Sequence, residues 1–402
     1  MSVFFKLARP DSVNQGEPVY GKASWARQFG LAGWGDIVHL EQVICPVDPQ
    51  HASVGDRVGN LAIVLPSPRV GDFVWTWHSE CLVTDRVLTL FREAGFTGFK
   101  TKPVVVEKVK RVRKGQPVTI PTLWELVVVG KGGHAHPDSG IRVIYTCEAC
   151  GMIRYSSYRN GIIVDEREWD GSDFFTVNGY PKHILVTERV KDLIVANELT
   201  NCLLIPSHQM RWPEGLPRPE ELHAEKLALA RRDLASLLAD LESPDRHKWW
   251  EAVSGLSEKR DPAAIEFLLK GFSRQDPLDR DWVASAVARI AGHAETPPDV
   301  RRQTVARLTE LLRDTDPRIR KSAAATLGFM GEREAGEAMM KLLQDPEESV
   351  RQTAVFVLGF VLRYRPALEG LKGMTRDPSR SVRETAKRAL RELASEKVDD
   401  SG

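Results

Sequence analysis

The stretch LQDPEESVRQTAVFVLG, residues 343–359, decides the fold of the second half of the chain, because its pattern recurs. Asp314, Asp345 and Asp377 each precede an arginine by six residues. An alanine and a leucine then follow each arginine at fixed distances, in the sets Arg320–Ala323–Leu327, Arg351–Ala354–Leu358 and Arg383–Ala386–Leu390. Helical units that recur at a spacing of 31 and 32 residues predict an α-solenoid.

Two weaker copies lie upstream of these three. Trp249 and Val283 take the position of the arginine there, and Ala252 and Ala286 take the position of the alanine. The segments between the copies begin with proline or a charged residue and have helical periodicity, which predicts a second helix in each unit. These second helices are expected at 262–272, 298–312, 334–343 and 366–374. We therefore expect about five helix pairs, preceded by a cap helix over 220–241.

The blocks 312–328, 343–359 and 374–390 resemble HEAT repeats, with an Asp-Pro turn, a Val-Arg pair or its equivalent, and small or aliphatic core residues. The resemblance implies that the aspartate and arginine positions form a ladder between neighbouring repeats. These six residues are thus expected to be structural, since each repeat is held by its neighbours. It also implies that the array binds a protein partner along its surface.

Prolines at 206, 213, 217 and 219 separate this helical half from a first half with mixed periodicity. The predicted organisation is an α+β domain over 1–206, a proline-rich linker over 207–219, an all-α HEAT-repeat solenoid over 220–395 and a disordered tail over 396–402.

Composition limits the class of partner. The 402 residues carry 56 Lys and Arg against 55 Asp and Glu, a net charge of +1. A nucleic-acid-binding domain needs an excess of cations, so bulk charge argues against such a partner. The N-terminus does not resemble a signal peptide, and the apolar runs are too short to predict a membrane partner. Five cysteines are a sparse, odd set, which favours a reduced, cytoplasmic protein over a disulfide-bonded one.

The first half contains several predicted strands, at 70–78, 104–112 and 122–129, and a helix at 84–94 that Gly95 ends. Trp75 and Trp77 would lie on one face of the first strand and are expected in the core. A second helix is expected to begin after Thr187, and a closing strand at Cys202. A basic cluster follows the 104–112 strand and splits over two faces, which indicates a solvated strand end; it comprises Lys108, Lys110, Arg111, Arg113 and Lys114.

Cys147 and Cys150 form a Cys-x-x-Cys-Gly knuckle between two predicted strands. Two thiolates at this spacing can hold half of a tetrahedral Zn²⁺ site, and Cys45 is the candidate third ligand. The alternative is a pair of thiols left from a lost site. Asp170 and Asp173 flank a nearby turn and are expected to cap it, since no nucleophile or base lies at a readable spacing.

The segments 147–151, 169–175 and 184–190 together are similar to the double-CxxCG motif proteins, which are abundant as paralogues in myxobacteria. Some members of that family act as immunity proteins for contact-delivered toxins. The resemblance covers about residues 130–206, and the first motif departs from it because Cys45 lacks its partner cysteine.

No catalytic constellation is found in either half. The resulting hypothesis is a non-catalytic protein-binding protein, in the narrower form an immunity or antitoxin-type protein that blocks a partner toxin. The alternatives are a general regulatory scaffold or adaptor, and a zinc-dependent enzyme of unknown class. An enzyme would need a third zinc ligand and a base that the sequence does not reveal.

Overall fold

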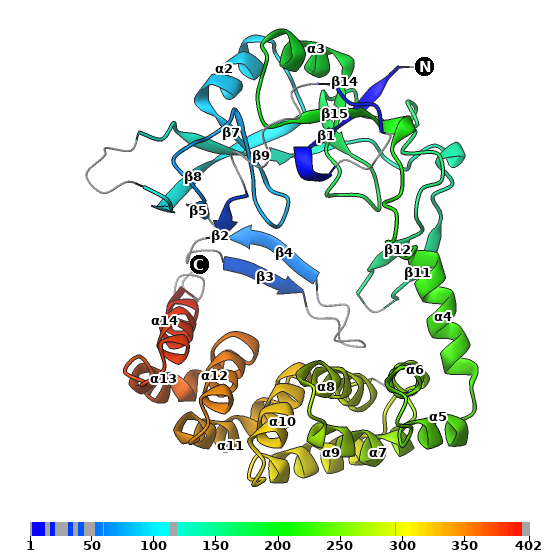
Figure 1. The fold of residues 1–402 in the computed structure, drawn as a ribbon, viewed down its shortest axis with the longest axis vertical. Coiled ribbons are helices and arrows are strands. Elements are labelled where there is room, and N and C mark those ends of the chain that lie inside the picture. Colours follow the sequence, from blue (N-terminus) through cyan, green and yellow to red (C-terminus); the bar gives the residue numbers. More distant parts are fainter. Residues whose placement is uncertain are drawn as a thin grey trace. The chain divides into compact units, whose positions relative to one another are not determined.

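A computed structural model of the chain describes residues 2–12, 17–20, 31–34, 39–43, 53–58, 60–112, 119–148, 150–293 and 295–395. The chain forms two compact units (Figure 1). Unit 1 comprises Met1–Glu41, Gly55–Cys147 and Ile153–Glu221, and unit 2 comprises Gln42–Val54, Glu148–Met152 and Leu222–Gly402. An α+β region is thus followed by a helical one, as the sequence predicts.

Unit 1 is built on two sheets. One has five strands in the order β10-β13-β14-β1-β15, antiparallel except for the β10–β13 pair. The strands are β10 (Gly130–Lys131), β13 (Phe174–Thr176), β14 (Leu185–Thr187), β1 (Phe4–Ala8) and β15 (Leu203–Pro206). The closing strand expected at Cys202 is therefore confirmed as β15, which pairs with the N-terminal strand.

The other sheet has six strands in the order β2-β5-β8-β9-β7-β6, with β5 and β8 parallel and the rest antiparallel. The strands are β2 (Gly33–Trp34), β5 (Leu61–Leu65), β8 (Phe99–Val109), β9 (Leu123–Val128), β7 (Cys81–Thr84) and β6 (Phe73–Trp75). β8 and β9 confirm the strands predicted at 104–112 and 122–129. Short antiparallel pairs are formed by β3 (His39–Val43) with β4 (Ser53–Val58) and by β11 (Val143–Thr146) with β12 (Ile153–Tyr155).

In the described part of unit 1, two helices cover the core, and both begin where the sequence predicts. α2 (Asp85–Glu93) follows Thr84 and ends before Gly95, whose φ of 67° suits glycine. α3 (Glu188–Ala196) follows Thr187. Their apolar faces pack with β1, β6, β7, β13 and β14 into one buried cluster rich in phenylalanine. Aromatic burial of this kind is the main source of the stability of such a unit.

The expectation for the tryptophan pair is wrong for one member. Trp75 is buried, and its indole nitrogen donates to the carbonyl of Asn201 at 2.8 Å. Trp77 is 69% exposed. β6 ends at Trp75, and the turn that follows, with Ser79 at a φ of 75°, interrupts the two-residue alternation that would have brought both rings to one face.

The predicted linker, 207–219, lies within unit 1. Met210 is buried, the hydroxyl of Tyr158 donates to the carbonyl of Arg211 at 3.1 Å, and the Trp212 ring packs against Tyr158. These apolar and aromatic side chains give the proline-rich segment a surface to bind, so the division between the units falls at Glu221–Leu222 instead.

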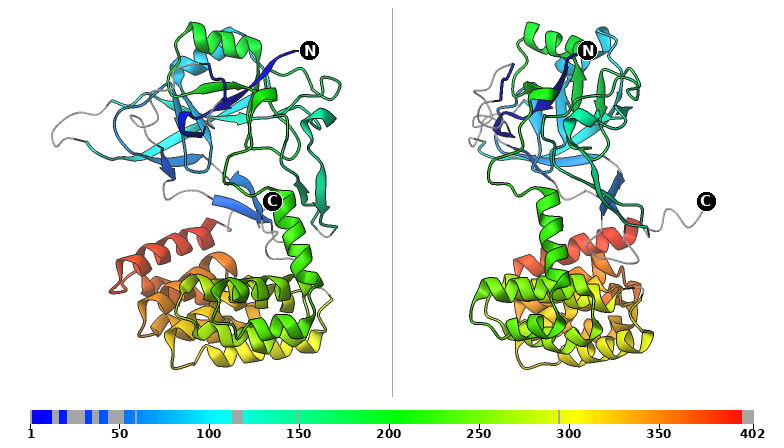
Figure 2. Two further views of the ribbon diagram at one scale, coloured as in Figure 1. Left: turned by 45° about the vertical axis from the view of Figure 1, so that its right-hand side comes forward. Right: turned by 90° about the vertical axis from the view of Figure 1, so that its right-hand side faces the viewer.

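Unit 2 is an array of helices in two layers, which can be followed in Figures 1 and 2. The first layer holds α6 (Arg246–Lys259), α8 (Pro277–Ala291), α10 (Pro317–Phe329), α12 (Glu348–Phe356) and α14 (Arg380–Ser395), each packed on the next. The second layer holds α7 (Ile265–Leu269), α9 (Pro298–Leu311), α11 (Gly336–Lys341) and α13 (Leu368–Met374). The four predicted second helices are thus present.

The predicted cap helix is two helices, α4 (Pro219–Arg231) and α5 (Leu234–Asp240). Asp233 separates them, because its carboxylate accepts the backbone N–H of Ser236 and so begins a new helix. None of the helices in the described part of the chain is long and apolar enough to cross a membrane. The predicted tail, 396–402, lies outside the described residues, as do Arg113 and Lys114 of the basic cluster.

Candidate interaction surface of the repeat array

The predicted ladder is present between the last repeats. Arg320 donates to both carboxylate oxygens of Asp345, at 2.6 and 2.7 Å, and Arg351 donates to both oxygens of Asp377, at 2.8 and 3.1 Å. The Nη1 atoms of these two arginines and of Arg383 also bond backbone carbonyls five and six residues earlier in the chain. Each arginine therefore fixes the start of its own helix, and Arg320 and Arg351 also hold the neighbouring repeat.

The second copy is out of register in the sequence alignment. Arg280, and not Val283, is the equivalent of Arg320, because its Nη1 bonds the carbonyls of Arg274 and Gln275 in the same way. The arginine position therefore advances by 40 residues between Arg280 and Arg320, against 31 and 32 in the later repeats. The difference is spread over the repeat: α8 has 15 residues against 13 in α10, the loop before the second layer is longer at 292–297 than at 330–332, and 3₁₀ turns extend α11 at both ends, so the segment 333–344 is only slightly shorter than α9.

In the corrected register the first rung of the ladder is a cation–π pair. Trp249 stands at the arginine position and Arg274 at the aspartate position, and the guanidinium lies 4.1 Å from the centre of the indole. The tryptophan, at 2% exposed, keeps the same interface packed without an ion pair.

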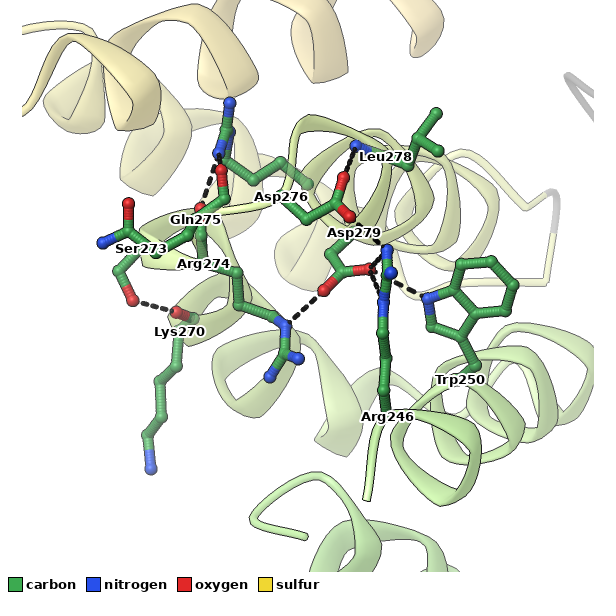
Figure 3. A network of polar contacts seen from close by, with 10 residues as sticks. Arg246, Trp250, Lys270, Ser273, Arg274, Gln275, Asp276, Leu278 and Asp279 are labelled. Atoms are coloured by element: carbon green, nitrogen blue, oxygen red, sulfur yellow. Dashed lines mark hydrogen bonds and ion pairs between the residues drawn. The ribbon is translucent and has the colours of Figure 1, made fainter. Parts of the chain in front are cut away.

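The carboxylate of Asp279 pairs with Arg274 and neutralises its charge (Figure 3). Its carboxylate accepts from Arg274 Nε at 2.8 Å, Arg246 Nε and Nη2 at 3.1 and 2.8 Å, and the Trp250 indole at 3.0 Å. Burial raises the pKa of Asp279, but the hydrogen bonds from Arg274 and Arg246 outweigh it and leave the pKa below its ordinary value. Asp279 is therefore charged at neutral pH and is a structural anion.

Apolar side chains gather on the first layer. Four large ones are between 44 and 58% exposed, on three successive helices: Leu278, Trp282, Phe329 and Phe356. Trp282 also stacks on Trp250, with ring centres 5.4 Å apart. We refer to these four residues and Trp250 together as the apolar row. Large exposed apolar groups on neighbouring elements are typical of interaction surfaces.

A groove of about 430 Å³ opens between α10, α12 and α14 and includes Phe356 of this row. Its lining comprises Lys321, Ser349, Gln352, Thr353, Phe356, Phe360, Thr385 and Arg388. The lining has two aromatic rings and two cations but no carboxylate, and the arrangement offers recognition of a partner group, not acid–base chemistry.

The predicted metal ligands are only partly described. Cys147 is buried and Cys150 half-buried at the turn after β11, whereas Cys45 lies outside the described residues. Within the described part of the chain, no three His, Cys, Asp or Glu side chains are grouped so that they could hold a metal ion. The zinc site therefore stays a prediction.

Asp170 and Asp173 are structural, as expected. Asp170 accepts the backbone N–H groups of Lys131 and Ser172, and Asp173 accepts from Thr97 and from the hydroxyl of Thr187. Both carboxylates thus stabilise loops of unit 1 and are bonded on several sides.

The layered helix pairs and the ladder define unit 2 as an α-solenoid. Residues 297–359 and 336–401 match the family described as HEAT repeats, so the C-terminal region contains HEAT repeats. No curated protein matches the chain.

Solved repeat structures resemble the chain over less than half of its length. The phycocyanin lyase CpcE–CpcF complex of Nostoc sp. PCC7120 is 21% identical over 42% of this chain and 67% of that one, with a TM-score of 0.31. The designed armadillo repeat protein YIII(Dq)4CqI is 18% identical over 44% and 96%, with a TM-score of 0.27.

A structure described as the basis of microtubule plus end tracking by XMAP215, CLIP-170 and EB1 is 14% identical over 43% and 83%, with a TM-score of 0.32. All three TM-scores are too low to support an inference about this chain.

Proposed function

We propose that the protein is a non-catalytic scaffold whose HEAT array binds a protein partner along its first layer. The observation that carries this proposal is the apolar row on α6, α8, α10 and α12, since such residues would be costly to leave in water over three or more successive helices. HEAT arrays recognise partners by shape over an extended surface, and the balanced charge of this chain suits that mode.

A pair of cross-linking variants tests the proposal. A photoreactive phenylalanine replaces either Phe329, on the first layer, or Phe267, on α7 of the second layer. The two side chains have similar exposure, so they differ mainly in the layer on which they lie. We expect a single stoichiometric adduct in the native cell from position 329. Adducts from position 267 alone, or equal adducts from both, would contradict the proposal.

The narrower hypothesis, an immunity-type protein that blocks a toxin, rests on the similarity of the first half to the double-CxxCG motif proteins. It gains support if the partner is encoded by the neighbouring reading frame and the two proteins co-purify in fixed ratio. Several unrelated partners would instead favour the regulatory adaptor.

A further inference from the structure

The groove between α10, α12 and α14 combines an aromatic floor with a cation on either side. Phe356 and Phe360 lie with their ring centres 5.5 Å apart, and Phe356 is 48% exposed. Lys321 comes from α10 and Arg388 from α14, so the two cations belong to the repeats on either side of the rings.

A local irregularity of the helix forms this floor. After Phe356 the chain enters a π-helical turn, Val357–Val361, in which the N–H of Leu362 bonds the carbonyl of Val357 at 2.8 Å. Phe360 lies in this turn. A π-turn is costlier than a regular α-helical turn and is frequent at functional sites, because it redirects side chains.

The two cations have no carboxylate partner among the described residues. Arg388 instead lies over the ring of Phe360, 5.8 Å from its centre. Gln352 is already engaged, since its amide donates to Ser381 of α14 at 2.6 Å. The positive charge of the groove is thus available to a partner.

The other aromatic pair of the array differs in this respect. Trp250 and Trp282 also stack and are partly exposed, but Arg246 beside them is bonded to Asp276 and Asp279. The charge of Arg246 is already neutralised there, so an acidic partner would gain no ion pair with it. Charge complementarity therefore favours the groove on α12.

We propose that this groove binds an acidic segment of the protein partner, with one apolar side chain seated on Phe356 and Phe360 and flanking carboxylates paired with Lys321 and Arg388. This inference rests on the proposed function and names the chemistry of its contact. A buried apolar anchor with charged groups at its rim is the arrangement in which few residues dominate binding. The groove volume, about 430 Å³, falls within the range of sites that enclose such a group.

Selection from a displayed library of random short peptides on the full-length protein tests the inference. We expect the enriched peptides to carry Asp or Glu within two positions of Leu, Met, Phe or Trp. Their binding should weaken roughly tenfold in Phe356→Ala, Lys321→Glu and Arg388→Glu. It should also weaken with added salt. Phe267→Ala is the matched control, an exposed aromatic on α7 of the second layer, outside both the groove and the apolar row, and should bind normally.

Circular dichroism establishes that each variant is folded. Enriched peptides without acidic residues, binding that ignores all three groove variants, or no enrichment at all would overturn the inference. A concentration-dependent dimer that these variants abolish, with no peptide bound, would assign the groove to a second copy and overturn it too. The cross-link from position 329 tests the proposed function separately. An adduct that persists in Phe356→Ala and Arg388→Glu, in which peptide binding is also unchanged, would support the scaffold function and contradict the assignment of the groove.

Discussion

Arg351 holds both carboxylate oxygens of Asp377 in the next repeat, at 2.8 and 3.1 Å, while its Nη1 atom bonds two carbonyls at the start of its own helix. The hydrogen bonds from Arg351 keep the pKa of Asp377 below its ordinary value, so the pair is charged at neutral pH. Asp377 is only 6% exposed, so this rung excludes most of the water that would screen it.

Removing one partner of this rung should therefore destabilise the array. We expect Asp377→Ala to lower the free energy of unfolding by about 3 kcal/mol, because Arg351 is left without its anion in a mostly buried place. Urea unfolding followed by circular dichroism measures this. The control is Lys372→Ala, which breaks an exposed pair with Glu369 and should cost under about 0.5 kcal/mol. Equal losses in the two variants would show that the ladder does not hold the repeats.

Replacing Arg274 of the first rung by the aspartate of the later rungs should destabilise the array. Arg274→Asp places the aspartate found at positions 345 and 377, yet it removes the cation from Trp249 and puts a second carboxylate beside Asp279. We expect a loss of roughly 2 kcal/mol or more, larger than that of Arg274→Ala. Thermal and urea unfolding of the two variants compare them. A stabilised Arg274→Asp protein would mean that the cation–π pair contributes nothing to this interface.

Alanine substitutions at two glycines, Gly359 and Gly373, test the close packing between the last two first-layer helices. A Cβ atom at Gly359 would overlap the Cβ of Ala389 on α14, so Gly359→Ala should cost roughly 1–3 kcal/mol. A Cβ atom at Gly373, in α13, would meet nothing within 4 Å, and Gly373→Ala should stabilise the helix by up to about 1 kcal/mol. Unfolding midpoints that move in the same direction would contradict this difference.

The ladder was predictable because Asp345, Arg351 and their copies keep one spacing, which is what a shared interface imposes on a sequence. The second copy was misplaced because its repeat carries extra residues in both helices and in the loops between them, and a fixed period cannot register such insertions. The groove was missed for a different reason: the π-turn that contains Phe360 has no side-chain signature in the sequence. Trp77 was placed in the core because alternation predicts the direction of a side chain only while the strand continues.

Metal content decides the zinc prediction at Cys45, Cys147 and Cys150. If these thiolates bind Zn²⁺, the purified protein should carry about one zinc per chain, and Cys150→Ser should lose it, because a tetrahedral site needs every ligand. Atomic emission on protein prepared without added metal measures this. Cys202→Ala, which removes a thiol buried in the core of unit 1, serves as the control and should keep the metal. A zinc-free parent protein would refute the site and with it the zinc-dependent enzyme.

His183 should make unit 1 sensitive to mild acid. Burial, with a smaller contribution from Lys6, lowers the pKa of its imidazole to about 3, and its Nδ1 atom has no hydrogen-bond partner among the described residues. The ring packs between Tyr158 and Tyr180 in its neutral form. The unfolded chain takes up the proton near pH 6.5 and the folded chain only near 3. The stability from the neutral ring is therefore complete above pH 6.5 and is lost as the pH falls, by up to about 1.4 kcal/mol per pH unit.

Between pH 7.5 and 5 the parent protein should lose about 2 kcal/mol more of its free energy of unfolding than His183→Phe, measured by urea unfolding. His247→Gln, which removes an exposed histidine, should lose as much as the parent. A His183→Phe protein with the same acid sensitivity as the parent would place the response elsewhere.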